Sequence, residues 1–273
     1  MKDIAKYAAL AVAVSAALLP VYWLVTISLK TEAEQFAVPP PWVSFELTWQ
    51  HYHDILIQRP FGRYLLTSAV VAVVSTALAL LLGTWAAYSL ARLSINKRLR
   101  EHVSLWMIST RMFPPIVTII PLFMLMRGLG LLNTMPALII VYTGLNLPFV
   151  VWMMRGFFEE VPHELEEAAL VDGDSRLGAL RRVLLPLVAP GLAATAVFCL
   201  MTCWNEFLFA LILTQTDRAM TLPVGIAGQV TQYEIKWGAM SAAAVVAMVP
   251  MFVFALAVQR YLVRGLSLGA VKG

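Results

Sequence analysis

Charged residues are scarce in this chain of 273 residues: Asp, Glu, Lys and Arg together make up 13%, whereas hydrophobic residues make up 60%. A soluble domain carries about 25% charged and about 45–50% apolar residues. A globule of this length cannot hide so much apolar surface from water, which argues against a soluble fold. The composition is that of a protein whose solvent is the lipid bilayer.

Sequence motifs of enzymes are also absent. The chain has no Gly-x-x-x-x-Gly-Lys-Ser/Thr phosphate loop, no His-Glu-x-x-His, no Cys-x-x-Cys and no serine in a nucleophile elbow. Cys199 and Cys203 lie four residues apart in an apolar run, which is typical of helix packing. His51 and His53 could chelate a metal in principle, but such a pair is more often plain surface. We expect no catalytic residue, no metal and no ATP hydrolysis by this chain.

The net charge of +4 and the pI near 9.2 raise the question of nucleic-acid binding. The basic residues sit in short clusters between apolar runs and form no continuous basic face. We therefore expect no nucleic-acid partner.

Six stretches are candidates for membrane-spanning helices, each of which needs about 20 apolar residues. Four are free of charge, and two are interrupted once, by Arg111 or by Glu206. The predicted spans cover residues 7–29, 64–91, 103–126, 135–154, 188–214 and 238–259. The first is too long for the core of a signal peptide and is predicted to be a retained anchor. We expect one all-α transmembrane domain over residues 1–273.

The lysines and arginines predict the orientation. They gather before the first span, between the second and third, between the fourth and fifth, and after the sixth, in clusters such as Lys97, Arg98 and Arg100. Positive residues stay on the cytoplasmic side, so both termini are expected to be cytoplasmic. An even number of spans requires the same. The external segment 30–63 contains three consecutive prolines and is predicted to be a non-helical surface segment.

The connection between the fourth and fifth spans, residues 155–187, is much longer than the about 2–8 residues that usually join helices of a bundle. Three glutamates near its middle favour a helix N-terminus, and Gly173 can adopt the positive φ that ends a helix. A second helix, capped by Asp174 or Ser175, is expected to end at Pro186. We predict a helix–turn–helix that lies along the membrane surface.

The sequence of this connection resembles the EAA loop of ATP-binding-cassette (ABC) importer permeases. Glu167-Ala168-Ala169, Gly173 and Val183-Leu184-Leu185-Pro186 fall at the family's spacing, with Val183 where the family often has Ile. The run from Trp204 to Ala210 resembles the fifth-helix signature of the maltose-type second permease, and residues 265–273 resemble its C-terminal end. The resemblance covers essentially the whole chain. It assigns to ATPase coupling Glu166, Glu167, Ala168, Ala169, Asp172, Gly173, Leu185 and Pro186.

The resemblance implies a multi-pass subunit of the bacterial inner membrane that forms half of the path for a sugar or related polyol. The implied partners are a second homologous permease, a dimer of ATPase subunits that binds ATP and Mg, and an extracytoplasmic solute-binding protein. This chain would bind no cofactor itself. The coupling helix would sit in a groove of the ATPase, with the tail 265–273 close by. Importers of glycerol phosphate share the same signatures, so the solute class stays open.

Two other classes are compatible with some of these features. A proton-coupled secondary carrier would use Glu206 as its relay, but such a carrier has no partner to push the long connection between the fourth and fifth spans. A receptor or purely structural membrane protein is disfavoured for the same reason. A helix that merely rests on lipid is the alternative for that connection, although anionic headgroups would repel its acidic residues.

The residues of a candidate solute path lie in the two interrupted spans. Sugar sites combine aromatic faces with amide and carboxylate groups, a mixture that Trp204, Asn205, Glu206 and Phe209 offer. Packing against a partner or within the bundle is the alternative for this cluster. Arg111 precedes two prolines that are expected to break or kink the third span. It could line a cavity, pair with Glu206 or extend toward the interface.

Overall fold

The computed structural model describes residues 2–93, 95–231 and 234–268. Of the family-like tail 265–273, residues 269–273 therefore lie outside the described residues. Every extended regular element within the described ranges is helical. In chain order the α-helices are α1 (Lys2–Leu29), α2 (Glu32–Gln35), α3 (Gln50–His53), α4 (Phe61–Arg92), α5 (Lys97–Thr110), α6 (Pro115–Gly128), α7 (Met135–Glu160), α8 (His163–Val171), α9 (Arg176–Ala179), α10 (Leu185–Trp204), α11 (Leu208–Leu213), α12 (Leu222–Ala227) and α13 (Trp237–Leu268), and two π-helical turns cover Asp54–Gln58 and Leu180–Leu184.

Five helical segments within the described residues are long and apolar enough to cross a membrane, and a bent pair adds a sixth when it is counted as one span. The five are α1, α4, α7, the segment Arg176–Trp204 and α13, and the pair is α5 with α6. This agrees with the six spans that the apolar runs predict. Several helices extend beyond those runs, since a helix continues past the membrane wherever its backbone hydrogen bonds can continue. The fifth predicted span, 188–214, is not one helix, because α10 and α11 are separated by three residues.

The bend in the third span lies between α5 and α6, whose axes meet at 92°. Pro114 precedes α6 and Pro115 opens it, and neither has a backbone N–H to continue the hydrogen bonds of α5. Pro115 is favourable as a first helical residue, so the same prolines that end one helix start the next. The helix break predicted from these prolines is confirmed.

The chain divides into two compact units, residues 1–65 with 221–252 and residues 66–220 with 253–273. In the first unit, α2 and α3 are short helices within the segment 30–63, so the prediction that this segment is non-helical is wrong. The polar residues around Thr31 supply the reason. The side chain of Glu34 accepts hydrogen bonds from the Thr31 backbone and hydroxyl, which closes a capping box on α2.

The loop that follows α1 is organised around Lys30, which is 1% exposed. Its carbonyl lies 2.9 Å from Nε2 of His51, and its ammonium lies 4.7 Å from the centre of the Trp23 ring. Burial lowers the pKa of Lys30, and the nearby Glu34 opposes that shift. His51 is thus engaged by the backbone, and the described residues contain no group of three or more His, Cys, Asp or Glu side chains arranged to hold a metal ion.

The second unit packs α7 between α4 and α10. Its buried core includes Ala79 and Ala87 from α4, Met154 from α7 and Val188 from α10. Small residues on α4 let the helices approach closely, as is usual between helices in lipid.

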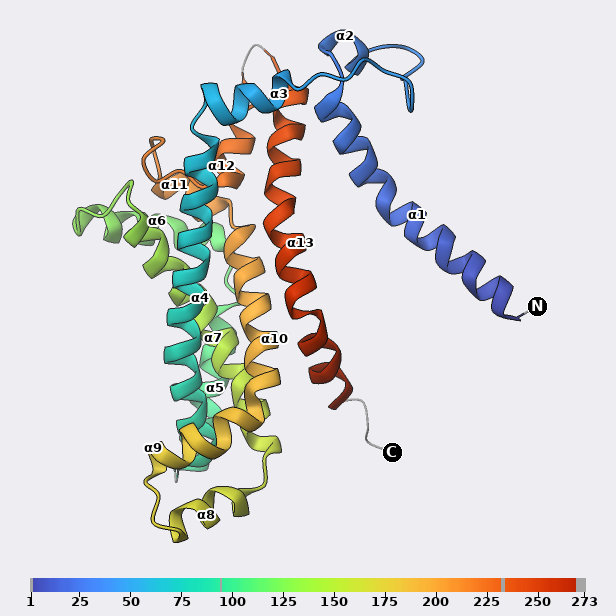
Figure 1. The fold of residues 1–273 in the computed structure, drawn as a ribbon. Helices are drawn as coiled ribbons and strands as arrows, with labels where there is room; N and C mark the ends of the chain where they lie inside the picture. The colour runs from blue at the N-terminus through green and yellow to red at the C-terminus, as the bar shows by residue number, and fades with distance from the viewer. Residues whose placement is uncertain (1, 94, 232–233, 269–273) are drawn as a thin grey trace. The chain divides into compact units, whose positions relative to one another are not determined.

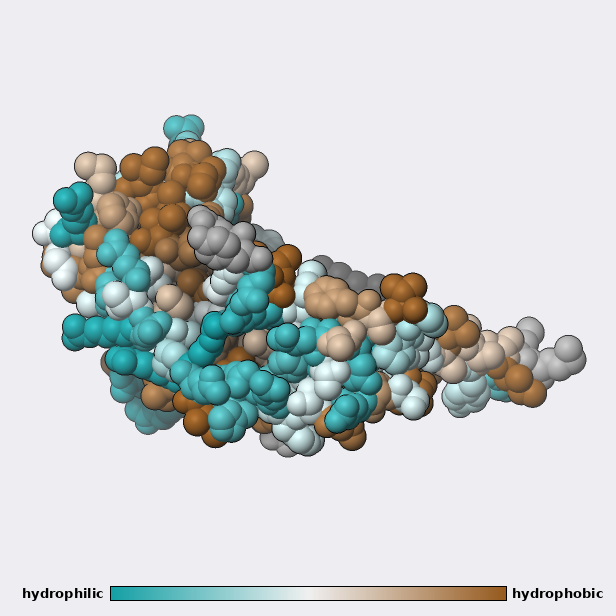
Figure 2. Space-filling model, turned by 90° about the horizontal axis from the view of Figure 1, so that it is seen from above, coloured by the Kyte–Doolittle hydropathy of each residue, from teal (hydrophilic) through white to brown (hydrophobic). Residues whose placement is uncertain are grey.

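Figure 1 shows α8 and α9 at one end of the second unit and α6 and α11 toward its other end. Figure 2, a view from above, shows hydrophilic side chains gathered on the face toward the viewer beside exposed hydrophobic ones.

Helix α4 approaches α7 closely at Gly83. A Cβ atom added at Gly83 would lie 2.6 Å from Cγ1 of Val150. Substituting Gly83→Ala must therefore push the helices apart, and overpacking of this kind costs about 1–3 kcal/mol. We expect a lower midpoint of thermal unfolding for the detergent-solubilised protein, measured by fluorescence or by loss of monodisperse material on heating.

Gly144 provides the matched control, since a Cβ atom there has no neighbour within 4 Å. Gly144→Ala is expected to leave the midpoint unchanged or to raise it slightly, because alanine favours a helix over glycine. Equal midpoints for Gly83→Ala and the parent protein would contradict the close packing of α4 on α7.

Candidate functional site

Helix α8 presents an outer and an inner face. It begins after Pro162, and its first turns carry the acidic residues expected at a helix N-terminus. Glu167 and Ala168 are exposed, as is Val171, which is 86% exposed. Glu166 points the other way and is 6% exposed. Two adjacent glutamates thus occupy opposite environments, which the sequence pattern does not distinguish.

The inner glutamate is held by α4. The hydroxyl of Tyr88 donates a hydrogen bond of 2.6 Å to Oε1 of Glu166. Nε of Arg92 lies 3.8 Å from Oε2 of the same carboxylate, and the Arg92 side chain is fully buried. Arg92 also donates through Nη2 to the carbonyls of Phe158 and Val161, at the end of α7. Neither Tyr88 nor Arg92 is among the site residues predicted from the sequence, because the motif positions lie 74 or more residues further along the chain.

The turn after α8 depends on Gly173, whose φ is +87°. Asp172 ends the helix, with its N–H directed to the carbonyls of Ala168 and Leu170. The next amides bond back to α8, including that of Asp174 to Ala169 at 3.0 Å. This is the pattern of a glycine-ended helix, in which a residue with a Cβ would be strained.

The next helix begins with Ser175, whose hydroxyl accepts a hydrogen bond from the Gly178 amide. The expectation that this helix ends at Pro186 is wrong. A π-helical turn, Leu180–Leu184, joins α9 directly to α10, in which Leu185 and Pro186 are the first residues. Near its N-terminus an α-helix has amides without intrahelical acceptors, so the missing N–H of proline is tolerated there. The segment after Gly173 is therefore continuous with the fifth span.

Glu206 lies in the break between α10 and α11. Its carboxylate accepts hydrogen bonds from the amides of Phe209 and Ala210, at 2.8 and 3.1 Å, and from the hydroxyl of Tyr142, at 2.5 Å. It therefore caps α11 and links it to α7. Three donors, two of them at a helix N-terminus, are the environment that stabilises a carboxylate away from water.

The other fifth-span candidates divide between the interior and the surface. Trp204 and Phe209 are 7% and 2% exposed and belong to the packed core of the unit. Asn205 is exposed, and its amide donates to the Met201 carbonyl at 2.8 Å. Its carboxamide oxygen accepts no hydrogen bond in the described part of the chain. Asn205 alone among these four offers free polar capacity at the surface.

Arg111 lies at the break between α5 and α6 and is exposed. Its guanidinium carbon is 5.1 Å from the centre of the Phe149 ring, and Phe149 in turn packs edge-on against Phe198 at 6.1 Å. The three hydrogen bonds accepted by Glu206 come from other groups, so those two charged residues of the spans are engaged separately. Phe149 and Phe198 were not predicted as site residues, because single aromatics in an apolar run carry no distinctive signal.

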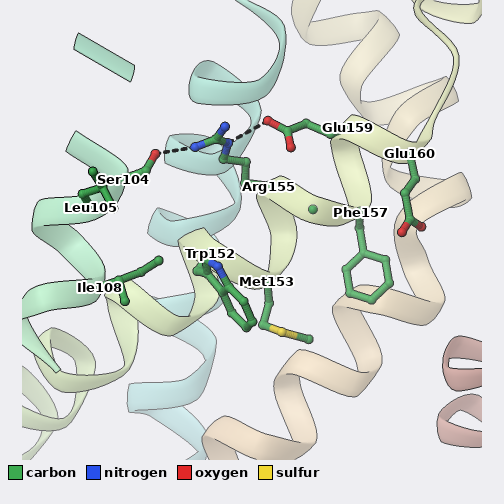
Figure 3. Close-up of a pocket in the computed structure, with 10 residues that line it drawn as sticks. Ser104, Leu105, Ile108, Trp152, Met153, Arg155, Phe157, Glu159 and Glu160 are labelled. Carbon is green, nitrogen blue, oxygen red and sulfur yellow. Dashed lines mark hydrogen bonds and ion pairs between the residues drawn. The ribbon is translucent and has the colours of Figure 1, made fainter. Parts of the chain in front are cut away.

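A cavity of about 420 Å³ lies between α5 and α7, toward the end that carries α8. Figure 3 shows Arg155 at its polar edge, bonded to Ser104 on α5 and to Glu159 on its own helix, where Nε and Oε1 are 2.7 Å apart. Trp152 and Ile108 form part of the apolar wall. The cavity combines an aromatic face with polar groups that bond to one another, since Arg155 donates to both Ser104 and Glu159.

Comparisons with known proteins identify the family. Residues 79–268 match the family model described as binding-protein-dependent transport system inner membrane component. The sulfoquinovosyl glycerol transport system permease protein SmoH of Agrobacterium fabrum is 40% identical over 94% of this chain and 89% of its own length. The trehalose transport system permease protein SugB of Mycobacterium tuberculosis is 39% identical over 94% of this chain and 93% of its own.

The fold is shared with a solved structure. In the crystal structure of a bacterial ABC transporter involved in the import of the acidic polysaccharide alginate, one chain superposes with a TM-score of 0.78 at 23% identity. The match covers 95% of this chain and 96% of that one. At this identity the likeness concerns the fold. Taken with the family model and the full-length relatives, it leads to one conclusion: the chain belongs to the binding-protein-dependent transport system inner membrane components, the permease subunits of ABC importers.

Proposed function

We propose that this chain forms half of the translocation path of an ABC importer for a sugar or sugar derivative, delivered by an extracytoplasmic binding protein. The observation that carries the proposal is the exposed outer face of α8, held between α7 and the fifth span by the turn at Gly173. The names of SmoH and SugB, both sugar-related permeases, support the solute class. Trehalose-like and anionic sugar derivatives are the first solutes to screen.

The outer face of α8 fits a protein groove better than a lipid surface. Glu167 is charged and exposed, while Val171 and Leu165 are 86% and 42% exposed. Anionic headgroups would repel the carboxylate. A groove with a basic edge and an apolar floor satisfies both kinds of side chain. The ATPase subunit of the importer, which binds ATP and Mg, is the partner of that chemistry.

The orientation follows from the charges. The basic clusters that flank α4, α5 and α7 support an orientation with the end that carries α8 in the cytoplasm of a bacterial cell, and the proposal has both termini on that side. The membrane is then the inner membrane, where the ATPase has access to cytoplasmic ATP. The opposite end faces the binding protein.

In this proposal the solute path passes Asn205 and Arg111. Both are exposed within interrupted spans, and an exposed polar group at membrane depth is tolerated where it faces protein or water. The network around Glu206 favours a structural role over a proton relay, because its two oxygens already accept three hydrogen bonds. This observation weighs against the proton-coupled carrier.

Assembly tests the proposal directly. We expect the chain, expressed with the genes that flank its own, to purify with one homologous permease and two copies of an ATPase. Native mass spectrometry of the purified complex measures the stoichiometry. A transport-competent assembly that contains only copies of this chain and no ATPase would overturn the proposal.

Coupling is tested at the outer face of α8 and at its turn. Glu167→Lys reverses the charge offered to the ATPase groove, and Gly173→Val forces a β-branched residue to φ +87°. Glu167→Lys is expected to reduce solute uptake per ATP hydrolysed by roughly tenfold, the loss that follows from one charged contact of about 1.4 kcal/mol. Gly173→Val is expected to lower the same ratio because it strains the turn that positions α8. Uptake and phosphate release in proteoliposomes give the ratio.

Glu101→Lys is the control, since Glu101 is an exposed acid on α5 and not part of α8. It should leave the ratio at the parent value. Parental ratios in both α8 variants would remove Glu167 and Gly173 from the coupling role.

The path is tested at Asn205. Asn205→Ala removes a surface amide and should slow solute uptake roughly five- to a hundredfold, the range for loss of a hydrogen bond of about 1–3 kcal/mol. Assembly and basal ATP hydrolysis should persist, because the side chain is exposed. Radiolabelled solute uptake is the measurement.

Glu206→Gln separates the alternatives for the same region. A cap on α11 predicts reduced thermal stability and no change in the pH dependence of uptake. A pH dependence that disappears in this variant would instead identify Glu206 as a proton relay.

A further inference from the structure

The ion pair between Arg92 and Glu166 differs in burial from the other ion pairs that involve α7 to α10. The Arg92 side chain has no exposed surface and that of Glu166 is 8% exposed. By contrast, Arg182 beside Asp174 is 75% exposed and Glu159 beside Arg155 is 44% exposed. Exposed pairs contribute little to stability, whereas a buried charge that loses its partner is strongly destabilised. The positions of Arg92 and Glu166 are therefore tightly dependent on each other.

This pair joins three helices at one point. Arg92 ends α4, its Nη2 donates to the Phe158 carbonyl at 2.6 Å and to that of Val161, and Glu166 belongs to α8. The last carbonyls of a helix lack intrahelical donors and favour a cation, so Arg92 also completes the end of α7. Tyr88, one turn before Arg92, adds a second bond from α4 to the same carboxylate, at 2.6 Å.

The contact also has unused bonding capacity. The separation of 3.8 Å between Nε of Arg92 and Oε2 of Glu166 is about 1 Å longer than a charge-assisted hydrogen bond. Nη1 of Arg92 is buried and has no hydrogen-bond partner in the described part of the chain. A small displacement of α8 toward α4 would let the carboxylate accept directly from Nε or Nη1. The arrangement therefore has a second, tighter geometry within reach.

We propose that Glu166, Arg92 and Tyr88 form a clamp that transmits the movement of α8 to the cytoplasmic ends of α4 and α7. Glu166 is a positioning residue that acts through Arg92, while its neighbour Glu167 faces outward. This inference rests on the proposed function, in which an ATPase displaces α8. In this arrangement Glu167 contacts the ATPase, and Glu166 transmits the movement of α8 to the membrane helices.

The test uses the assembled importer in lipid nanodiscs and requires no knowledge of the solute. Hydrogen–deuterium exchange is measured by mass spectrometry in peptides from α8 and from the end of α4, with and without ATP and orthovanadate. In the parent complex we expect both regions to change their exchange rates. In Glu166→Gln, which keeps the size of the side chain, α8 should still respond. The response at the end of α4 should fall by about tenfold, as expected for loss of a charged hydrogen bond.

Glu101→Gln, an exposed acid on α5, is the matched control and should respond like the parent. Tyr88→Phe keeps the aromatic ring and removes one hydrogen bond to the Glu166 carboxylate. It provides an independent test if the Glu166→Gln complex assembles poorly. If Glu166 had only a structural role, its substitution would lower the thermal stability of the complex, and the exchange responses of α4 and α8 would change together.

Parental responses at the end of α4 in both Glu166→Gln and Tyr88→Phe would overturn the clamp. Loss of the α8 response in these variants would also overturn the clamp, because the Glu166 carboxylate would then be needed for α8 to bind the ATPase. If the exchange rate of α8 in the parent complex does not change with ATP and orthovanadate, the proposed coupling role of α8 is wrong. The clamp, which depends on that role, is then wrong as well.

Discussion

A charged side chain that enters the apolar layer of a membrane must be paired or hydrogen-bonded, because no water is available to solvate it. Glu206 meets this requirement at the N-terminus of α11, where two backbone amides and the Tyr142 hydroxyl surround its carboxylate. Arg92, which lies just beyond the second predicted span and is fully buried, is engaged at the opposite kind of helix end, where the carbonyls of Phe158 and Val161 accept its hydrogen bonds. The helix ends within and beside the bundle are thus the places where charge is tolerated.

The same requirement explains why interrupted helices and candidate functional residues coincide. Two prolines interrupt the third span, and the break leaves Arg111 exposed above the Phe149 ring. The fifth span is interrupted next to Glu206, and the break leaves Asn205 exposed. At each break the backbone leaves the regular helical hydrogen-bond pattern, and the polar side chain beside it is exposed rather than packed in the core. The interruptions therefore create polar surface within helices that otherwise contact lipid or other helices.

Helix α8 combines two properties that a coupling element needs. Its outer face is exposed and carries Glu167 beside apolar residues, so it is available to a partner protein. Its inner face carries Glu166, which is fastened to α4 by a buried ion pair and a short hydrogen bond. In the proposed clamp, a force applied to the outer face would reach the membrane helices through this ion pair, whose partners cannot separate without leaving a buried charge unpaired.

The sequence by itself determined the membrane class, the six spans, the break in the third span and the glycine turn after α8, because these depend on local composition and on backbone limits of proline and glycine. It also identified the EAA-like segment as the region of interest.

Only the tertiary structure decided which residues of each motif face inward. Glu166 and Glu167 are chemically identical neighbours, and their different environments follow from the position of Arg92, 74 residues before Glu166 in the chain. Likewise, Asn205 became the exposed member of its cluster because Trp204 and Phe209 pack into the core, while Glu206 caps a helix whose start no local pattern predicted. Contacts between residues distant in the chain depend on how the helices pack, and a periodic apolar pattern does not specify that packing.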